Sequence, residues 1–236
     1  MEQQTKSNYF KGLSKRDYIE KAYEIIQNEG IAAVSIRRIA KEMGCSSASM
    51  YRYFGNLTEL LFYAELRELQ GYIKRLNASE KRWKNVWDIY VGVWDCYARE
   101  AFKKPEAYDL LFFKYSNMKL QKVFKEYYEM FPEDIEDANH IFAEMLYAPS
   151  FVGRDFRMCR RCIRANAINY YEAIQLNRVV CMTYKGYLKT ILDDGIREEQ
   201  IEGRVREFIS DVDMIVMKLA KDLKGYNGYY STKKNI

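Results

Sequence analysis

Hydrophobic residues recur along this chain at intervals of three and four, the spacing that places side chains on one face of an α-helix. The first such run starts at Ile19. Ser14 precedes it with Asp17 three residues on, a pair typical of a capping box, and Gly30 follows it. The pattern predicts a first helix over residues 15–29.

Two shorter helices are expected next. Ser35 can cap a second helix that continues to Met43 and is closed by Gly44. Ser46 can cap a third, which ends near Phe54. Longer helical patterns then cover residues 57–76, 79–102, 105–129, 133–147, 155–194 and 204–224. Because no run alternates with the period of two that strands require, the predicted fold class is all-α.

Composition and charge narrow the class further. The chain has 236 residues, of which 48% are hydrophobic and only three are proline, so a folded protein with a sizeable core is expected. Residues 1–56 hold nine Lys or Arg against six Asp or Glu, a basic surplus that favours a polyanionic partner. No apolar run approaches the roughly 18 residues of a membrane span. Neither a membrane partner nor a secretory signal is indicated, and a cytoplasmic location with five reduced cysteines is expected.

The segment after Gly44 combines small side chains with a cluster of rings. A helix that enters the DNA major groove needs small polar residues at its N-terminal end, since bulk there would hold the backbone away from the base edges. The candidate DNA-contacting residues of this segment are Ser46, Ser47, Ala48, Ser49, Tyr51, Arg52 and Tyr53.

The sequence SIRRIAKEMGCSSASMYRYFGNLTELL, within a match of about residues 14–62, resembles the helix-turn-helix of the TetR family of bacterial transcription regulators. The resemblance implies that Ser35 and Tyr51 contact phosphates. It implies that base edges are approached by Arg37, Ser47, Ser49, Arg52 and Tyr53.

One departure from the family pattern stands at Leu57, where many relatives carry a phosphate-binding lysine. We hypothesise compensation from an N-terminal arm that contains Lys6, Lys11, Lys15 and Arg16.

The resemblance also implies a division of the chain into domains with separate functions. Residues 1–56 are expected to form the DNA-binding domain, residues 57–76 a linker helix, and residues 77–236 a helical domain for effector binding and dimerisation. The second region is rich in aromatic residues, which suit either an ordinary core or a pocket for a flat, apolar or cationic small molecule. The candidate pocket residues are Trp87, Tyr90, Trp94, Tyr108, Phe112, Tyr127, Tyr147 and Tyr171.

The last two helical patterns carry apolar stripes broader than one supporting helix needs. Packed against their copies in a second chain, they would form a two-fold, four-helix interface, as the family does. The candidate interface residues are Ile174, Met182, Phe208, Val212, Ile215, Val216 and Leu219.

Three further patterns have an ordinary structural explanation beside a functional one. The first, Glu136, His140 and Glu144, has helical spacing that suits either a metal or a solvated face. No metal site is assigned.

The second pattern is Cys159 and Cys162, a CxxC without the second pair that a zinc site needs, so structural thiols are expected. Cys45, in the turn before the third helix, similarly suits a small buried role or a redox one.

The third pattern is a stripe of arginines that could bind an anion, bridge to the acidic run 133–137, or simply face solvent. Its members are Arg154, Arg157, Arg161 and Arg164.

With one histidine, no nucleophile elbow and no phosphate-binding glycine loop, an enzyme is not expected and no cofactor is assigned. The predicted function is a homodimeric regulator, a repressor released from a palindromic operator by a small molecule. The alternative is a DNA-binding protein of the same fold controlled by a protein partner.

Overall fold

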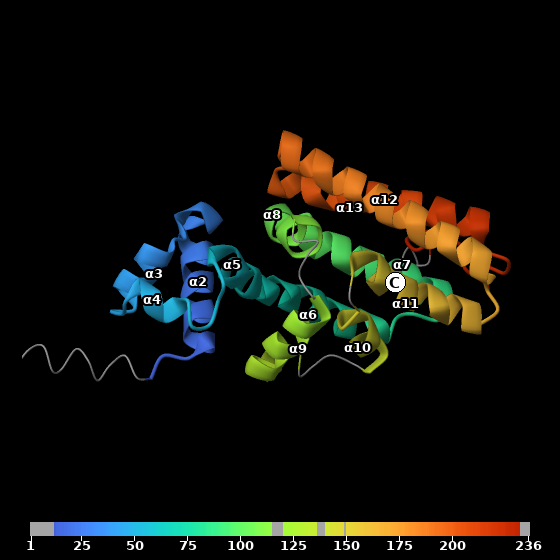
Figure 1. Cartoon of the computed structure of the whole chain (residues 1–236). Coiled ribbons are helices and arrows are strands. Elements are labelled where there is room, and N and C mark those ends of the chain that lie inside the picture. Colours follow the sequence, from blue (N-terminus) through green and yellow to red (C-terminus); the bar gives the residue numbers. More distant parts are fainter. Residues whose placement is uncertain (1–11, 115–119, 136–139, 149, 232–236) are drawn as a thin grey trace, which may run out of the picture. The chain divides into compact units, whose positions relative to one another are not determined.

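The computed structural model describes residues 12–114, 120–135, 140–148 and 150–231 (Figure 1). Helices and the turns between them account for these residues, and none of them lies in a strand, which confirms the all-α fold class. The chain divides into two compact units, Met1–Arg67 and Glu68–Ile236.

The first unit is a small helical bundle. It contains α2 Lys15–Glu29, the short 3₁₀ turn η1 Ile31–Ala33, α3 Ile36–Glu42, α4 Ser47–Met50 and α5 Leu57–Glu65. As predicted, α2 starts at a capping box in which the Ser14 hydroxyl accepts from the Asp17 amide and the Asp17 carboxylate accepts from the Ser14 amide. Helix α4 is shorter than expected, since a turn over 51–53 follows Met50.

The core of the first unit joins all of its main helices. Its fully or almost fully buried side chains are Tyr18, Ile19, Ala22, Ile39, Met50, Phe54 and Leu60. Burial of this apolar surface, at about 25 cal/mol for each Å² removed from water, is the main force that holds the helices of this unit together.

The second unit is larger and wholly helical in its regular structure. After the 3₁₀ turn η2 Leu66–Glu68, its elements are α6 Leu69–Glu80, α7 Val86–Ala101, α8 Pro105–Asp109, the π-helical turn η3 Leu110–Lys114, α9 Leu120–Met130, the 3₁₀ turn η4 Pro132–Asp134, α10 His140–Leu146, α11 Phe151–Arg164, α12 Tyr170–Asp194 and α13 Glu198–Leu219. Helix α7 is central, and packs against α6, α11 and α13 (Figure 1).

Several predicted helices are in fact interrupted. The segment 57–76 breaks at η2, and 79–102 contains the end of α6, an irregular stretch and then α7. The segment 105–129 contains α8, η3 and α9, and its residues 115–119 lie outside the described residues. In the predicted helix 133–147, residues 136–139 also lie outside them. The last helix starts and ends earlier than its predicted range 204–224.

The segment 155–194, predicted as one helix, is two. Asn166 adopts a positive φ of 53°, and the amide of Ala167 donates to the carbonyl of Cys162, which ends α11. Asn169 then caps α12 through the amide of Glu172. Two asparagines therefore separate what the hydrophobic spacing alone joins.

Gly92 allows one close contact at the centre of the second unit. A Cβ at this position of α7 would lie 2.4 Å from the ring of Trp83. The Trp83 indole therefore rests directly on the helix backbone.

The C-terminal segment is attached by tyrosines. Tyr226 donates to Asp213 of α13, and Tyr230 donates to Asp95 of α7 over 2.5 Å. Residues beyond the last helix thus complete the packing of the second unit.

Candidate nucleic-acid interface and ligand cavity

The turn between α3 and α4 is sharp because Gly44 adopts a φ of +65°, a conformation that residues with a Cβ rarely take. The Cys45 amide donates to the carbonyl of Ala40 over 2.8 Å and closes the turn. Cys45 itself is half-buried, with its sulfur 3.5 Å from the Tyr18 hydroxyl.

The start of α4 presents small side chains to solvent. Ser46 and Ala48 are exposed and Ser47 is half-buried. The Ser46 hydroxyl makes no capping bond, so it is not committed to the helix. Just beyond α4, Tyr51 is 54% exposed and Arg52 is also exposed.

Helix α3 adds an exposed basic residue, and Arg37 and Arg38 on it have different roles. Arg38 pairs with Glu29 of α2 and with Glu42 on its own helix. Its hydrogen bond to Glu29 holds the pKa of that carboxyl below its usual range. Arg37 is exposed and makes no ion pair with any residue that the structure describes. Ser35 is exposed, and its hydroxyl caps α3 by accepting from the Arg38 amide over 3.2 Å.

Two predicted DNA contacts are engaged within the unit instead. Ser49 is 9% exposed, and its hydroxyl lies 2.7 Å from the Tyr18 hydroxyl and donates to the Ser46 carbonyl over 2.6 Å. Tyr53 is half-buried and donates to the carbonyl of Leu13 over 2.7 Å. The expectation that Ser49 faces a groove is therefore wrong, and the hydroxyl of Tyr53 is tied to the residues that precede α2.

The start of α5 is capped by Asn56, which accepts from the Glu59 amide, while Leu57 is half-buried. Of the cations suggested to compensate for Leu57, Lys15 lies 4.0 Å from the centre of the Tyr63 ring and Arg16 pairs with Glu20. Both are therefore already engaged within the unit. Lys6 and Lys11 lie outside the described residues.

This geometry defines a class: a helix-turn-helix unit with a small-residue helix start, flanked by exposed basic and tyrosine side chains. Residues 19–64 match the profile of the bacterial regulatory proteins of the tetR family. The HTH-type transcriptional regulator SAR2658 of Staphylococcus aureus is 27% identical over 168 residues, which cover 68% of this chain and 91% of that protein. A second regulator of this species, SAB2452, is 26% identical over 143 residues, covering 57% and 76% respectively.

Residues 19–64 therefore form a DNA-binding helix-turn-helix of the TetR family, and the relatives whose similarity extends beyond it are transcription regulators. A solved structure of a Rhodococcus protein of unknown function has the same fold, with a TM-score of 0.57 at 17% identity. It aligns with 89% of this chain and 97% of its own.

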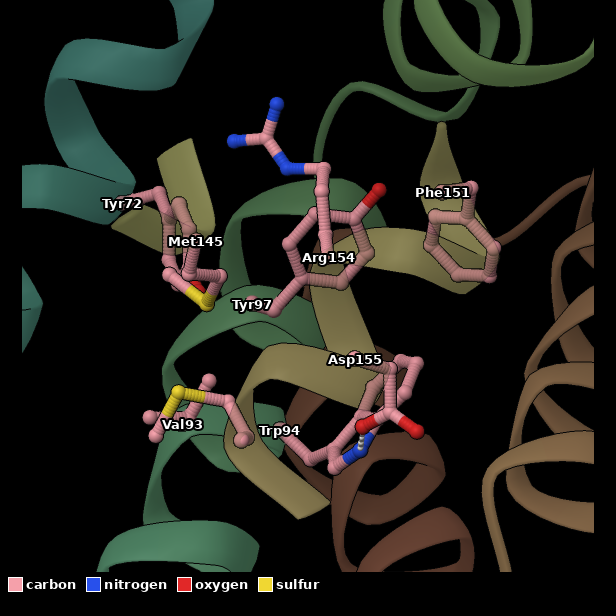
Figure 2. A pocket seen from close by; sticks show the side chains of 9 residues that line it. Tyr72, Val93, Trp94, Tyr97, Met145, Phe151, Arg154 and Asp155 are labelled. Carbon is pink, nitrogen blue, oxygen red and sulfur yellow. Dashed lines mark hydrogen bonds between the residues drawn. The ribbon is translucent and has the colours of Figure 1, made fainter. Parts of the chain in front are cut away.

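The second unit contains a small cavity of about 30 Å³ between α6, α7, α10 and α11 (Figure 2). Its lining is mostly rings and methionines: Tyr72, Val93, Trp94, Tyr97, Met145, Phe151, Arg154, Asp155 and Met158. Of the eight predicted pocket residues, only Trp94 belongs to this lining.

The other predicted pocket residues lie elsewhere. Trp87, Tyr90, Tyr108 and Tyr127 are completely buried in the packed core. Hydrogen bonds occupy the polar ends of all four. Trp87 donates to the carbonyl of Asp222, Tyr90 to Asp155, and Tyr127 to Asp134. Tyr108 donates to the carbonyl of Glu68 over 3.5 Å.

The last three predicted pocket residues are less enclosed. Phe112 lies beside the guanidinium of Arg154, and Tyr147 is half-buried against Tyr128. Tyr171 is 69% exposed, which contradicts its assignment to a pocket. Rings at similar helical spacing thus serve as core, cavity wall and surface.

The cavity also holds two charged residues, neither of which was predicted to line a pocket. Asp155 accepts from Trp94 Nε1 over 2.8 Å (Figure 2). It also accepts from Asn177 Nδ2 over 2.8 Å. Burial raises the pKa of Asp155 to about 6, although these hydrogen bonds act in the opposite direction. Arg154 is 5% exposed, and neither of its terminal nitrogens has a hydrogen-bond partner among the described residues.

The remaining arginines of the stripe lie apart from Arg154. Arg157, Arg161 and Arg164 line an open groove on α11, together with Arg160 and Lys84. Arg157 reaches Glu144 at 4.0 Å, whereas the acidic residues 136 and 137 lie outside the described residues.

The metal-compatible pattern is only partly described. Glu136 and the side chain of His140 lie outside the described residues, and Glu144 is exposed. Among the residues that are described, no three His, Cys, Asp or Glu side chains converge as a metal site requires. Cys159 and Cys162 are buried free thiols, and burial raises the pKa of Cys162 to about 12.

Helices α12 and α13 pack side by side (Figure 1). Both helices expose apolar residues. Of the predicted interface residues, Met182 is 66% exposed and Ile174 is 40% exposed, while Ile215 and Leu219 are half-buried.

Phe208, Val212 and Val216 are completely buried within the unit, so their assignment to an interface is wrong. Two exposed residues of α13, Met214 (63%) and Met217 (44%), were not among the predicted interface residues.

No helix in the described ranges combines the length and the apolar character that crossing a membrane requires.

Proposed function

We propose that this regulator binds a palindromic operator as a homodimer and is released from it by a small molecule that enters the second unit. The observation that carries the proposal is the exposed small-residue start of α4, within a segment that matches the TetR family. Its location is then the cytoplasm, where the DNA is.

The DNA-contacting set follows from exposure. Ser46, Ser47 and Ala48 allow the start of α4 to approach the base edges, and Arg37 and Arg52 can donate to them. Contacts to phosphates come from Tyr51 and from the hydroxyl of Ser35, which can still donate its proton while it caps α3. Tyr53 stays a candidate through its ring edge only, and Ser49 is left out because it is buried.

Dimerisation is supported by the apolar outer surface of α12 and α13. Met182, Met214, Met217 and Ile174 are exposed, and Val179 lines one groove with Met214 and Met217, a concentration of apolar side chains that is unusual on a monomer surface. Packing this surface against its copy would bury it in a four-helix arrangement and supply two recognition helices.

Release by a small molecule requires that the molecule bind one conformation better than the other. The cavity next to Trp94 is the proposed site. It is lined by α6, and that helix follows directly along the chain from η2, where the first unit ends. A change in α6 on binding would therefore be passed on by the backbone itself.

Selection of DNA from a random pool by the purified full-length protein tests this function. We expect a two-fold symmetric motif. If each protomer neutralises three or four phosphates, log affinity should fall with log salt with a slope of roughly −5 to −7. An asymmetric motif would refute the proposal that a dimer binds a palindromic operator, and a slope near zero would refute DNA binding.

A further inference from the structure

Arg154 is a charged side chain in an apolar enclosure. It is 5% exposed, and both of its terminal nitrogens are buried without a hydrogen-bond partner among the described residues. Isolated buried charge is costly, and native proteins normally pair a buried guanidinium with carboxylates or carbonyls. Among the described residues, therefore, nothing accepts from these strong hydrogen-bond donors.

The surroundings of Arg154 are aromatic. Its guanidinium carbon lies 5.0 Å from the centre of the Phe112 ring and 4.8 Å from that of Phe124. These contacts stabilise the charge by stacking but accept none of its N–H groups. Figure 2 shows that Arg154 and Tyr97 extend to the same side of the cavity.

Tyrosine hydroxyls lie near this charge. Burial raises the pKa of Tyr72, Tyr97 and Tyr128, and at each of the three the charge of Arg154 acts in the opposite direction. The hydroxyl of Tyr128 is buried and, within the described part of the chain, has no hydrogen-bond partner. A cation and a hydroxyl donor are thus available in the same region of the second unit.

Asp155, the adjacent carboxylate, does not neutralise Arg154 by contact. Its oxygens accept from Trp94, Asn177 and Tyr90, the last over 3.3 Å. Neighbouring positions on a helix point in directions about 100° apart, so Asp155 turns toward α7 and α12 while Arg154 faces Phe112 and Phe124. No described residue supplies the acceptor that the terminal nitrogens of Arg154 lack.

We propose that the cavity binds a monoanionic organic carboxylate with an apolar body, whose carboxylate accepts paired N–H bonds from Arg154. This proposal rests on the proposed function, since it specifies the chemical class of the effector. The rings and methionines of the lining must move apart to receive the apolar body, because the ligand-free cavity of about 30 Å³ has the volume of about one water molecule. The effector is thus an anion, and the cationic ligand that aromatic walls alone would allow is disfavoured by Arg154.

The charge count favours a carboxylate over a phosphate monoester. One guanidinium balances one negative charge, and its planar fork matches the two carboxylate oxygens. A dianion would bring an excess negative charge into an enclosure that already contains Asp155.

The test uses two matched pairs of probes with the full-length protein: decanoate against decanamide, and indole-3-acetate against indole-3-acetamide. Decyl phosphate is the dianionic comparison. Calorimetric titration gives affinity, and the thermal midpoint by circular dichroism gives stabilisation. We expect at least one carboxylate to bind about tenfold or more tightly than its amide, because only the anion forms charge-assisted bonds. No preference for either carboxylate, or tighter binding of decyl phosphate, overturns the proposal.

Arg154→Met removes the charge and keeps an apolar side chain of similar length. We expect it to lose the preference for the carboxylate and to be at least as stable as the wild type without ligand, because the unpaired buried charge is gone. Arg154→Lys, which keeps the charge without the fork, should retain weak binding. Arg164→Met, at an exposed position on the same helix, is the control and should bind as the wild type does.

A destabilised Arg154→Met that still prefers the carboxylate would show that Arg154 is structural, and would overturn the proposal. If Arg154→Met does not fold, the proposal is still tested by the wild-type preference for acid over amide and by carboxylate binding to the Arg154→Lys variant. Binding to the duplex selected from the random pool is measured in parallel. Intact DNA binding without carboxylate preference overturns this inference alone, whereas absence of DNA binding overturns the proposed function.

Discussion

The hydrogen bond between Tyr18 and Ser49 should be a structural element of the DNA-binding unit. Tyr18 is completely buried, and its hydroxyl lies 2.7 Å from that of Ser49. Ser49→Ala leaves the Tyr18 hydroxyl with only the Cys45 sulfur at 3.5 Å, a weak partner. An unsatisfied buried polar group costs about 1 to 3 kcal/mol, and the weak sulfur contact places our expectation at about 1 to 2 kcal/mol.

The partner substitution should cost less. In Tyr18→Phe, the Ser49 hydroxyl keeps its bond to the Ser46 carbonyl at 2.6 Å, so we expect a loss of about 0.5 to 1 kcal/mol. The double variant should lose less than the sum of the two, with a coupling energy of about 1 kcal/mol.

Hydrogen exchange followed by mass spectrometry is the suitable assay. All three tryptophans, Trp83, Trp87 and Trp94, lie in the second unit, so tryptophan fluorescence does not report on the first. A loss of 1 to 2 kcal/mol corresponds to roughly 5- to 30-fold faster exchange of protected amides in α2.

Ser46→Ala is the matched control, because this exposed hydroxyl makes no capping bond. It should leave exchange unchanged within about 0.5 kcal/mol while weakening binding to the selected duplex. Ser49→Ala should do the reverse. If Ser49→Ala left exchange unchanged and selectively weakened binding to the selected duplex, our assignment of Ser49 to the core would be refuted.

Three further predictions address DNA, assembly and pH. Tyr51→Phe should weaken binding to the selected duplex and to random DNA equally, whereas Arg52→Ala should cost about 1 to 3 kcal/mol of binding free energy on the selected duplex only. Anisotropy titrations measure both affinities. If Arg52→Ala weakened binding to both DNAs equally, Arg52 would not contact base edges. Met182→Glu places a charge in the proposed interface and should give monomers in sedimentation, so a stable dimer would contradict that interface. Hydrogen bonds from Arg99 hold the pKa of Glu202 at about 2, below the value of about 4.3 in unfolded chains. The contribution of Glu202 to the free energy of unfolding is therefore present above pH 4.3 and is lost as pH falls through 2. Urea unfolding should find Glu202→Gln less stable by at most about 1 kcal/mol at pH 7 and equal to wild type near pH 2, and the same deficit at both pH values would exclude this ion pair as its cause.

Features set by a few neighbouring residues were predictable from the sequence. Ser14 and Asp17 locate the start of α2, and Gly30 its end, because cap bonds form within one helical turn. Ser35 and Gly44 similarly define α3 and the turn after it. The same logic applied to Asn166 and Asn169 would have separated α11 from α12, but the continuous hydrophobic spacing concealed that break.

Features that depend on distant partners were not predictable. Ser49 has the same small hydroxyl whether it faces DNA or Tyr18, and only the packing of α2 against α4 decides. Arg154 shares helical spacing with the exposed arginines of α11, yet Phe124 of α9, some thirty residues earlier, covers it.

The apolar stripe of α13 also contained two surfaces that composition alone could not separate. Phe208 and Val212 serve the core of the second unit, and Met214 and Met217 lie on its exterior.

The buried Arg154 guanidinium, whose terminal nitrogens have no hydrogen-bond partner among the described residues, has a consequence for the lifetime of the regulator in a cell. A protein that holds such a charge while empty opens more often than one that does not, and proteases degrade the opened population. Occupancy by an anion closes this route, since binding to the folded form lowers the opened fraction in proportion to the free ligand. If the effector is the carboxylate proposed above, it would thus change the abundance of the regulator as well as its affinity for DNA.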